Sequence, residues 1–328
     1  MLAGFLATMA RVEATYSCCT PHDITSLKVR FPKIDWLPYN KAQRQEAVAN
    51  CDIWLGLGGT PFQSAVSSWM TDHLTEEALM CKTAEKDMYF LGIGGQDEEA
   101  FHSTQTKAVI GQSKGLWIRD LLSYEYLTKA VGKQAKITAS ADLGHLFFSQ
   151  NSFSTVKKGR FLTCLNFDYK YWPNLEPTLA LVSAELPLKE QIWLIQESRS
   201  LPGAEKDLFL TLPAQEQAKW TEYSIDLPLK SLQNCISSWP NSEWALTSRF
   251  HTTLACAWAG TKTVVLDTNI KLKSAAEECG FTLLKPSASP SEITDAIKEA
   301  RSADLSLLNT KAFLAEESVH AFCRAIKI

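Results

Sequence analysis

The chain has 328 residues, of which 45% are hydrophobic, and a formal net charge of -3. This length favours two domains of about 150 residues, each able to bury a core. The small negative charge excludes the broad basic surface of non-specific nucleic-acid binding, so nucleic acid is not an expected partner.

The first half of the chain alternates buried apolar strands with single helices. Residues 1–50 have the weakest pattern, with a helix ending near residue 29 and a strand over residues 31–36. Beyond them, strands are predicted at 52–57, 88–93, 115–120 and 136–139, and helices at 69–83, 100–110 and 123–131. Alternation of this kind is typical of a parallel, doubly wound sheet.

Glycine-rich loops follow two of these strands. Gly58 and Gly59 precede Thr60, and Gly92 to Gly95 repeat the pattern. Paired glycines let a ligand approach the backbone closely. A tight turn needs the same residues, and the spacing matches neither a Walker loop nor a dinucleotide fingerprint, so both interpretations stay open.

A polar, hydroxyl-rich linker over residues 149–159 separates the two halves. Further strands are predicted at 160–167, 191–196, 244–246, 263–266 and 281–284, and helices at 177–186, 228–237, 252–258, 273–279, 291–301 and 304–328. An aromatic loop at 168–173 could stack on a sugar ring or belong to the core. We therefore predict an α/β fold of two Rossmann-like domains, residues 1–150 and 151–328, whose parallel sheets face each other across a cleft.

A short polar turn, Ser248-Arg249-Phe250-His251, lies between a predicted strand and a predicted helix. Open α/β sheets bind ligands at this edge, and a helix N-terminus favours an anion. Arg249 adds a planar fork of donors for carboxylate or phosphate, and His251 a group that exchanges protons near neutral pH. The turn therefore indicates an anionic substrate that is also protonated. Equally, Arg249 could pair with the Glu243 region while His251 caps the helix.

The glycine loops of the first half would stand opposite this turn across the cleft. We therefore expect a donor molecule to bind on the side of this turn and an acceptor molecule on the side of the glycine loops. The acceptor side would be formed by Gly58, Gly59, Thr60 and Arg119. Asp120 and Asp142 are candidates for the base that takes the hydroxyl proton of the bound saccharide. For Asp120, an ion pair with Arg119 is the favoured alternative; for Asp142, catalysis and structure are equally supported.

Composition bounds the remaining chemistry. Nine cysteines are scattered without a C-x-x-C pair, which favours a reducing cytoplasm. The first ten residues lack a basic leader, and no apolar run approaches a membrane span, so only peripheral membrane contact is expected. Six histidines show no metal-ligand spacing and no Gly-x-Ser-x-Gly elbow is present, so neither a metal nor another cofactor is expected.

An ordered set of short motifs resembles the polysaccharide pyruvyl transferase family. The motifs are Gly58-Gly59, Gly92-Ile93-Gly94, Ile118-Arg119-Asp120 with Ser123, Leu127 and Gly132, Ala141-Asp142, and Ser248-Arg249-Phe250-His251 followed by Gly260, the strand 264–267 and Lys271. The resemblance implies a glycosyltransferase-B-like arrangement of the two domains. It also implies transfer of a pyruvyl ketal from phosphoenolpyruvate to a saccharide, in the synthesis of cell-surface polysaccharide.

The resemblance also assigns roles to residues. Ser248, Arg249, His251 and Lys271 would hold the donor, with His251 as the acid that protonates its methylene carbon, and Asp142 would join His251 and Arg249 as a catalytic residue. The first domain would bind the saccharide acceptor, which could be lipid-linked, and the second the donor.

The chain departs from the family's pattern in two places. It lacks the N-terminal Gly-Asn-x-Gly-Asp loop, and Asn166, Phe167 and Asp168 stand where the family often has an arginine, with Lys170 as the nearest cation. Two other functions therefore stay open. One is a glycosyltransferase of the same architecture that uses a nucleotide-activated sugar or ulosonic acid, and the other is a non-catalytic binding protein with the same fold.

Overall fold

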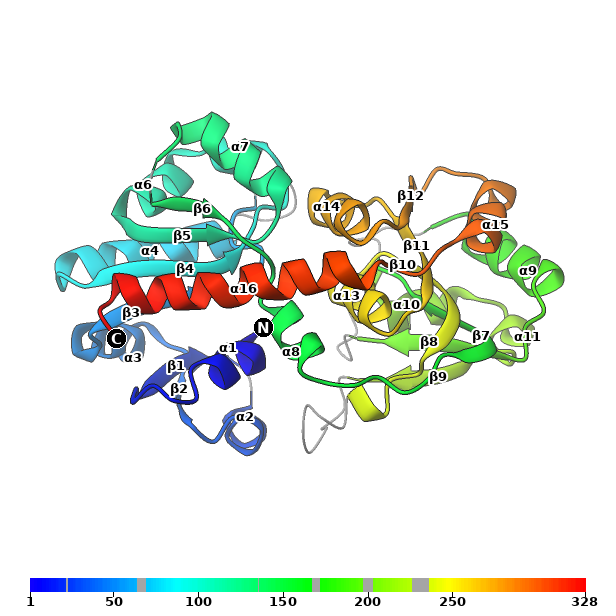
Figure 1. Ribbon diagram of the computed structural model, residues 1–328, viewed down its shortest axis with the longest axis horizontal. Helices are drawn as coiled ribbons and strands as arrows, with labels where there is room; N and C mark the ends of the chain where they lie inside the picture. The colour runs from blue at the N-terminus through cyan, green and yellow to red at the C-terminus, as the bar shows by residue number, and fades with distance from the viewer. Residues whose placement is uncertain (22, 64–68, 135, 167–171, 197–202, 226–235) are drawn as a thin grey trace. The chain divides into compact units, whose positions relative to one another are not determined.

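The computed structural model describes residues 1–21, 23–63, 69–134, 136–166, 172–196, 203–225 and 236–328. The chain folds as two compact units (Figure 1). Unit 1 contains Met1–Phe147 and Thr310–Ile328, and unit 2 contains Phe148–Asn309. The terminal stretch thus groups with unit 1, whereas the sequence placed it with the second domain. Most of the predicted aromatic loop and of the predicted helix at 228–237 lies outside the described residues.

Unit 1 is built on a four-stranded parallel sheet in the order β3-β4-β5-β6, beside a parallel pair of β1 and β2. The strands are β1 (Tyr16–Thr20), β2 (Ile34–Pro38), β3 (Ile53–Leu57), β4 (Asp87–Ile93), β5 (Ser113–Ile118) and β6 (Ile137–Ala139). The helices are α1 (Leu2–Thr8), α2 (Ile24–Arg30), α3 (Lys41–Asn50), α4 (Trp69–Thr83), α5 (Glu99–His102), α6 (Thr104–Gln112), α7 (Leu121–Val131) and α8 (Gly144–Ser149).

Alternate side chains of the unit 1 strands bury both faces of the sheet. Phe90 and Leu116 pack with α4, α6 and α7 on one face. Tyr89 and Trp117 pack with α1 and with α16 (Leu305–Ala325) on the other, where Phe322 meets both rings edge-on. Burial on both faces explains the nearly continuous apolar strands of the sequence.

Unit 2 contains a six-stranded sheet in the order β12-β11-β10-β7-β8-β9, and every pair is parallel. Its strands are β7 (Lys157–Cys164), β8 (Glu190–Ile195), β9 (Thr221–Ser224), β10 (Ser242–Thr247), β11 (Lys262–Leu266) and β12 (Thr282–Leu284). The helices are α9 (Leu175–Glu185), α10 (Glu205–Thr211), α11 (Ala214–Gln217), α13 (Phe250–Trp258), α14 (Ile270–Cys279) and α15 (Pro290–Glu299).

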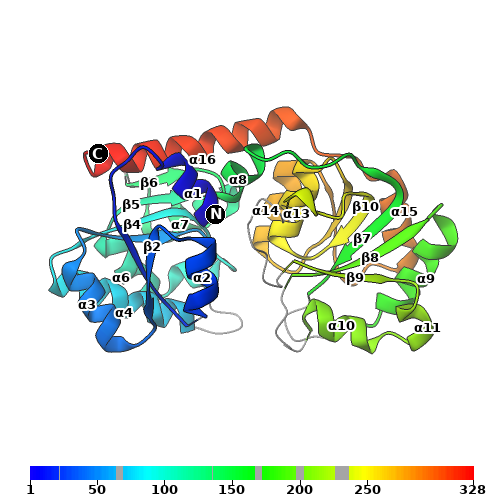
Figure 2. The same cartoon turned by 90° about the horizontal axis from the view of Figure 1, so that it is seen from below.

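Both faces of the unit 2 sheet are covered by helices (Figure 2). Trp193 and Leu246 pack with α9, α10 and α15 on one face. Ala245 and Val265 point to the other face, toward α13 and α14. The α/β class with parallel sheets is therefore confirmed, and the central β10 strand leads directly into α13.

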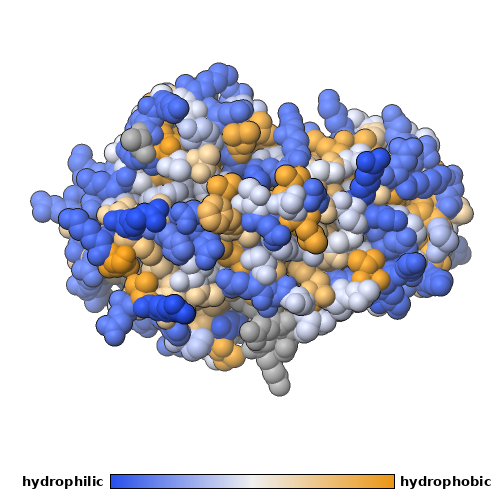
Figure 3. Space-filling view, in the orientation of Figure 1, coloured by the Kyte–Doolittle hydropathy of each residue, from blue (hydrophilic) through white to orange (hydrophobic). Residues whose placement is uncertain are grey.

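Two local predictions differ from the structure. The single helix expected at 100–110 is two helices, because Ser103 accepts a hydrogen bond from Thr106 N at 3.1 Å and begins α6 as its N-cap. The sequence also predicts that the last helix packs on the body through Phe313, Val319, Phe322 and Ile326. In α16, Val319 and Phe322 are buried as this predicts, whereas Phe313 is 60% exposed. Leu305, Leu307 and Leu314 of the same helix are exposed as well, and the face drawn in Figure 3 shows hydrophobic residues scattered among hydrophilic ones.

A buried ion pair joins α3 to α4 in unit 1. Arg44 Nε donates to Glu77 Oε1 at 2.6 Å, and both side chains are buried. Trp54 Nε1 donates to the other oxygen of Glu77 at 3.0 Å. Removing one partner of such a pair typically costs about 3–5 kcal/mol, because a buried charge loses its counter-ion. His73, on α4, lies beside this pair with Nε2 3.8 Å from Glu77 Oε1.

This packing makes stability depend on pH. Burial lowers the pKa of His73, and the charge of Arg44 lowers it further. Because the unfolded chain then binds the proton more tightly than the folded protein, the free energy of unfolding falls as the pH drops from about 6.5 toward the folded pKa. We expect His73→Gln to flatten this dependence in denaturant titrations between about pH 7 and 5. His320→Gln, at an exposed position, is the control; a His73→Gln slope equal to that of the wild type would contradict the assignment.

Candidate functional site

The predicted Ser-Arg-Phe-His turn lies at the carboxyl edge of the unit 2 sheet. Ser248 Oγ accepts from Asn166 N at 2.6 Å and donates to Asn166 O at 2.8 Å. Thr247 Oγ1 donates to Cys164 O and accepts from Arg249 N, each at 3.0 Å. These hydroxyl groups tie the end of β10 to the end of β7. Ser248 is buried, and its hydrogen bonds shape the turn.

Arg249 is the N-cap residue of α13 and forms an ion pair through Nε with Glu205 Oε1. The Glu205 side chain is fully buried, whereas 27% of the Arg249 side chain is exposed. The alternative partner near Glu243 is not used in this contact: Glu243 instead pairs with Lys262 at 3.3 Å. The structure therefore pairs Arg249 with a carboxylate that no local sequence pattern indicated.

His251 and Lys271 begin neighbouring helices. His251 is the second residue of α13, so it lies inside the first turn rather than at the N-cap, and its ring meets Phe250 edge-on with centroids 5.2 Å apart. Lys271 is the second residue of α14, whose N-cap Asn269 accepts from Leu272 N at 3.3 Å. Both residues are partly exposed, and Nε2 of His251 is buried. Because β10 and β11 are parallel neighbours, both helix N-termini lie at the same edge of the sheet.

The chemistry of this edge suits an anion. An arginine at the N-cap has no acceptor with which to close the first turn of the helix. The N–H groups of that turn carry partial positive charge, and a guanidinium adds a full one. An imidazole in the same turn can exchange a proton with what binds there.

In unit 1, the predicted acceptor residues form a buried polar network at the ends of β3, β5 and β6. Arg119 Nη2 donates to Thr60 Oγ1 at 2.9 Å, and Nη1 donates to Asp142 Oδ2 at 3.3 Å. Arg119 Nε lies 3.5 Å from Asp120 Oδ2, so the ion pair favoured for Asp120 is present. The side chains of Arg119, Asp120 and Asp142 are each 2% exposed. Asp142 also accepts from Gly144 N at 2.7 Å.

The glycines around this network have different roles. A Cβ at Gly58 would lie 2.0 Å from Met1 Sδ, so a side chain of the protein already fills that space. Gly59 has φ +81°, and no atom of the described residues lies within 4 Å of its Cβ position, which leaves room beside its backbone in that part of the chain. A Cβ at Gly94 would lie 2.7 Å from Asp120 Oδ2 and 2.9 Å from Arg119 Nε. Only Gly59 thus matches the expected close approach of a ligand, and Gly94 makes space for the ion network.

The structure brings Ser248, Arg249 and His251 together in unit 2, and Thr60, Arg119 and Asp142 together in unit 1. Sequence reasoning missed Asn166 as the partner of Ser248 and Glu205 as the partner of Arg249. Glu205 begins a polar helix and has no local pattern that separates it from an exposed glutamate.

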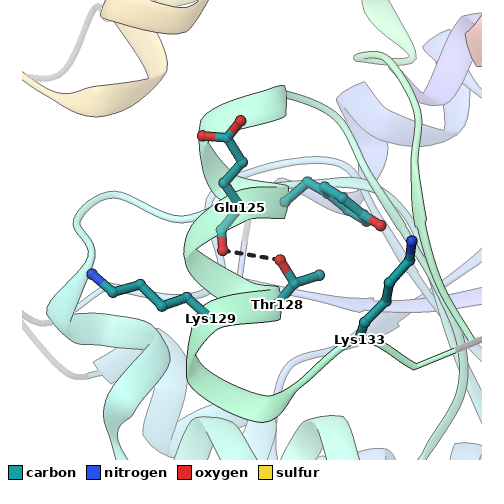
Figure 4. Close-up of a pocket in the computed structure, with 5 residues that line it drawn as sticks. Glu125, Thr128, Lys129 and Lys133 are labelled. Atoms are coloured by element: carbon teal, nitrogen blue, oxygen red, sulfur yellow. Dashed lines mark hydrogen bonds between the residues drawn. The ribbon is translucent and has the colours of Figure 1, made fainter.

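The described residues contain no group of three or more histidine, cysteine, aspartate or glutamate side chains placed to hold a metal ion. No helix among them is both long and apolar enough to cross a membrane. A surface hollow on α7 is lined by Tyr124, Glu125, Thr128, Lys129 and Lys133 (Figure 4). It contains none of the predicted site residues.

No family model matches the chain, and no curated protein matches it. Solved structures do match over nearly its whole length. UDP-N-acetylglucosamine 2-epimerase from Rickettsia bellii has 12% identity and a TM-score of 0.66, covering 99% of this chain and 92% of its own. Staphylococcus aureus MnaA, solved with UDP, has 11% identity and a TM-score of 0.65, covering 99% and 93%. Anabaena Alr3699/HepE, also in complex with UDP, has 11% identity and a TM-score of 0.55, covering 98% and 89%.

These likenesses establish the fold: the chain is an α/β protein with parallel sheets of the glycosyltransferase-B-like type. None of these three similar proteins is described as a pyruvyl transferase. At this level of identity the fold is what the likeness shows, and the site has to be argued from the residues of this chain.

The network around Gly94 gives a stability prediction. We expect Gly94→Ala to lower the free energy of unfolding by about 1–3 kcal/mol, because the added methyl group pushes against the Asp120 carboxylate and the Arg119 guanidinium. Gly111→Ala, in α6 with nothing within 4 Å of its Cβ position, is the matched control and should be neutral or stabilising. Denaturant unfolding measures both. Equal stability of the two variants would show that Gly94 is not required by the network.

Proposed function

We propose that the chain is an enzyme that acts on a sugar and binds the phosphate of an activated donor at the β10–α13 turn of unit 2. The observation that supports this most strongly is the position of Arg249. Arg249 is the N-cap residue of α13 at the carboxyl edge of a parallel sheet, and its side chain is partly exposed. Phosphate groups bind at such helix N-termini, and arginine recognises them with paired donors.

The donor we favour is a nucleoside diphosphate sugar, and the reaction is transfer of the sugar to a saccharide acceptor. Two of the similar structures were solved with UDP, which supports this donor class. In the transfer, a hydroxyl oxygen of the acceptor bonds to the anomeric carbon and loses its proton, the bond from that carbon to the diphosphate oxygen breaks, and the diphosphate leaves with the electron pair. Arg249 and the N-terminus of α13 would stabilise the charge that develops there. His251 would exchange a proton with the leaving phosphate, and Lys271 would add a second cation from α14.

Transfer of a pyruvyl group from phosphoenolpyruvate is the second candidate, supported by the ordered motifs from Gly58 to Lys271. It uses the same anion site in a different way. His251 would protonate the methylene carbon, and a first sugar hydroxyl would attack the resulting electrophilic carbon. A second hydroxyl of the same sugar would then take the place of the phosphate, which leaves toward Arg249, and so close the cyclic ketal. The two candidates therefore share residues and differ in the donor that stabilises the protein.

Unit 1 is the proposed acceptor side in both candidates. Gly59 offers space beside its backbone, and Arg119 holds Thr60 in place through a hydrogen bond of 2.9 Å. Arg119 itself is nearly fully buried, so its role in the proposal is to position Thr60. Asp142 is retained as the acceptor of the hydroxyl proton, held by Arg119 and Gly144. We also propose that the enzyme works in the cytoplasm and that its product becomes part of a cell-surface polysaccharide.

Ligand binding tests the proposed function directly. We expect UDP or UDP-sugars to raise the melting temperature, since a ligand at 100 times its Kd adds about 2.7 kcal/mol of stability. Phosphoenolpyruvate should do so only if the second candidate is right. Arg249→Ala should remove the shift, and Arg160→Ala, which breaks an ion pair at the amino end of β7, should keep it. A wild-type protein that no phosphorylated donor stabilises would favour the non-catalytic alternative.

Turnover tests His251 separately from binding. We expect His251→Ala to lower kcat by about 10²–10⁴-fold, the range typical of a positioned general acid or base. The variant should keep the melting temperature shift, because Arg249 and the helix N-terminus still hold the anion. Normal turnover would remove His251 from the chemistry, and failure to fold would assign it a structural role in α13.

A further inference from the structure

We infer that Glu205 is a positioning residue that fixes the guanidinium of Arg249 for the donor's phosphate. This inference rests on the proposed function and adds a residue to the same site. Glu205 is the first residue of α10, far from Arg249 in the sequence, and its carboxylate accepts the Nε–H of Arg249. The pair therefore brings a second helix to the site.

Glu205 is itself held from several directions. Its side chain is fully buried, and its backbone carbonyl accepts from Trp193 Nε1 at 2.8 Å. The Cys164 thiol donates to Glu205 Oε1 across 3.9 Å. Burial and the charge of Glu205 raise the pKa of Cys164 well above its usual range, so the thiol keeps the proton it donates. A carboxylate fixed in this way holds the longer side chain of Arg249 in one position.

The contact uses one edge of the guanidinium. Glu205 accepts the Nε–H, which lies on the side of the group. In our proposal the terminal Nη groups bind the phosphate with paired donors. Holding Nε sets the plane of the whole guanidinium, because the group is planar. Arginine loses less freedom for each hydrogen bond when its plane is set in advance, and preorganised donors bind an anion more tightly.

The negative charge of Glu205, considered by itself, would have the opposite effect on phosphate binding. Glu205 is negative and lies next to the proposed anion site, so its charge repels a phosphate and removing it should tighten binding. If Glu205 positions Arg249, removing its acceptor oxygen should weaken binding despite the gain in net positive charge. The two effects have opposite signs, and one set of substitutions separates them.

The experiment measures the Kd for UDP by calorimetry in the full-length chain. Glu205→Met keeps the length of the side chain and removes both charge and acceptor; Glu205→Gln removes the charge and keeps an acceptor oxygen. We expect Glu205→Met to raise Kd on the order of tenfold, with Glu205→Gln close to the wild type, because the hydrogen bond restores the position. Glu190→Met, which breaks the pair with Arg160 at the amino end of β8, is the matched control and should leave Kd unchanged.

Other results overturn the inference. Equal tightening in Glu205→Met and Glu205→Gln would show that Glu205 acts only through its charge, and an unchanged Kd in both would show a purely structural pair. In an Arg249→Ala background, Glu205→Met should no longer weaken UDP binding, because the weakening that it causes in the wild type acts through Arg249. If Glu205→Met does not fold, Glu205→Asp keeps the charge and shortens the reach, and a wild-type Kd in that variant would overturn the inference.

Failure of the proposed function has a separate signature. A wild-type chain that binds none of UDP, inorganic pyrophosphate and phosphoenolpyruvate overturns the anion site, and the role of Glu205 with it. A wild-type chain that binds UDP, together with a Glu205→Met variant that binds it equally well, overturns only the role of Glu205.

Discussion

The hydrogen-bonded junction between the ends of β7 and β10 is the constraint on which the unit 2 site depends. Ser248 accepts from and donates to the backbone of Asn166, and Thr247 joins Cys164 O to Arg249 N. These contacts satisfy backbone groups at the sheet edge that would otherwise need another partner. They also fix where β10 ends and α13 begins. The position of Arg249 and His251 follows from that junction and from the buried carboxylate of Glu205.

The two units use the same edge of a parallel sheet in different ways. In unit 1, Arg119 has its guanidinium contacts with Asp120, Asp142 and Thr60, and it is almost completely buried. In unit 2, Arg249 also has a buried carboxylate partner, but 27% of its side chain stays exposed. A buried arginine with carboxylates on two sides is suited to hold a loop in place. A partly exposed arginine with its Nε fixed is suited to bind an anion, and this difference assigns the donor to unit 2 in our proposal.

Much of the fold could be predicted from the sequence because its signals are local. Buried strands such as 263–266 are apolar on both faces, and Gly260 ends α13 with φ +73° as its position suggested. Strand β1 was missed because most of its residues are exposed or partly exposed, and Cys18 and Cys19 give no alternating pattern. The break at Ser103 was missed because one serine cap interrupts an otherwise continuous helical pattern.

The site was predicted less completely, for a physical reason. Ser248, Arg249 and His251 are neighbours in the sequence, so their proximity is a local property. Glu205 reaches the site only through the packing of α10 on the sheet, and no short-range pattern carries that information. The grouping of residues 310–328 with unit 1 has the same origin, since it depends on contacts with strands far away in the sequence.

The most direct test of the central claim is a crystal structure of the chain grown or soaked with UDP. Our account predicts phosphate density at the N-terminus of α13, within hydrogen-bond distance of Arg249, with the Arg249–Glu205 pair intact. Phosphate bound elsewhere on the chain, with the β10–α13 turn unoccupied at saturating UDP, would contradict it.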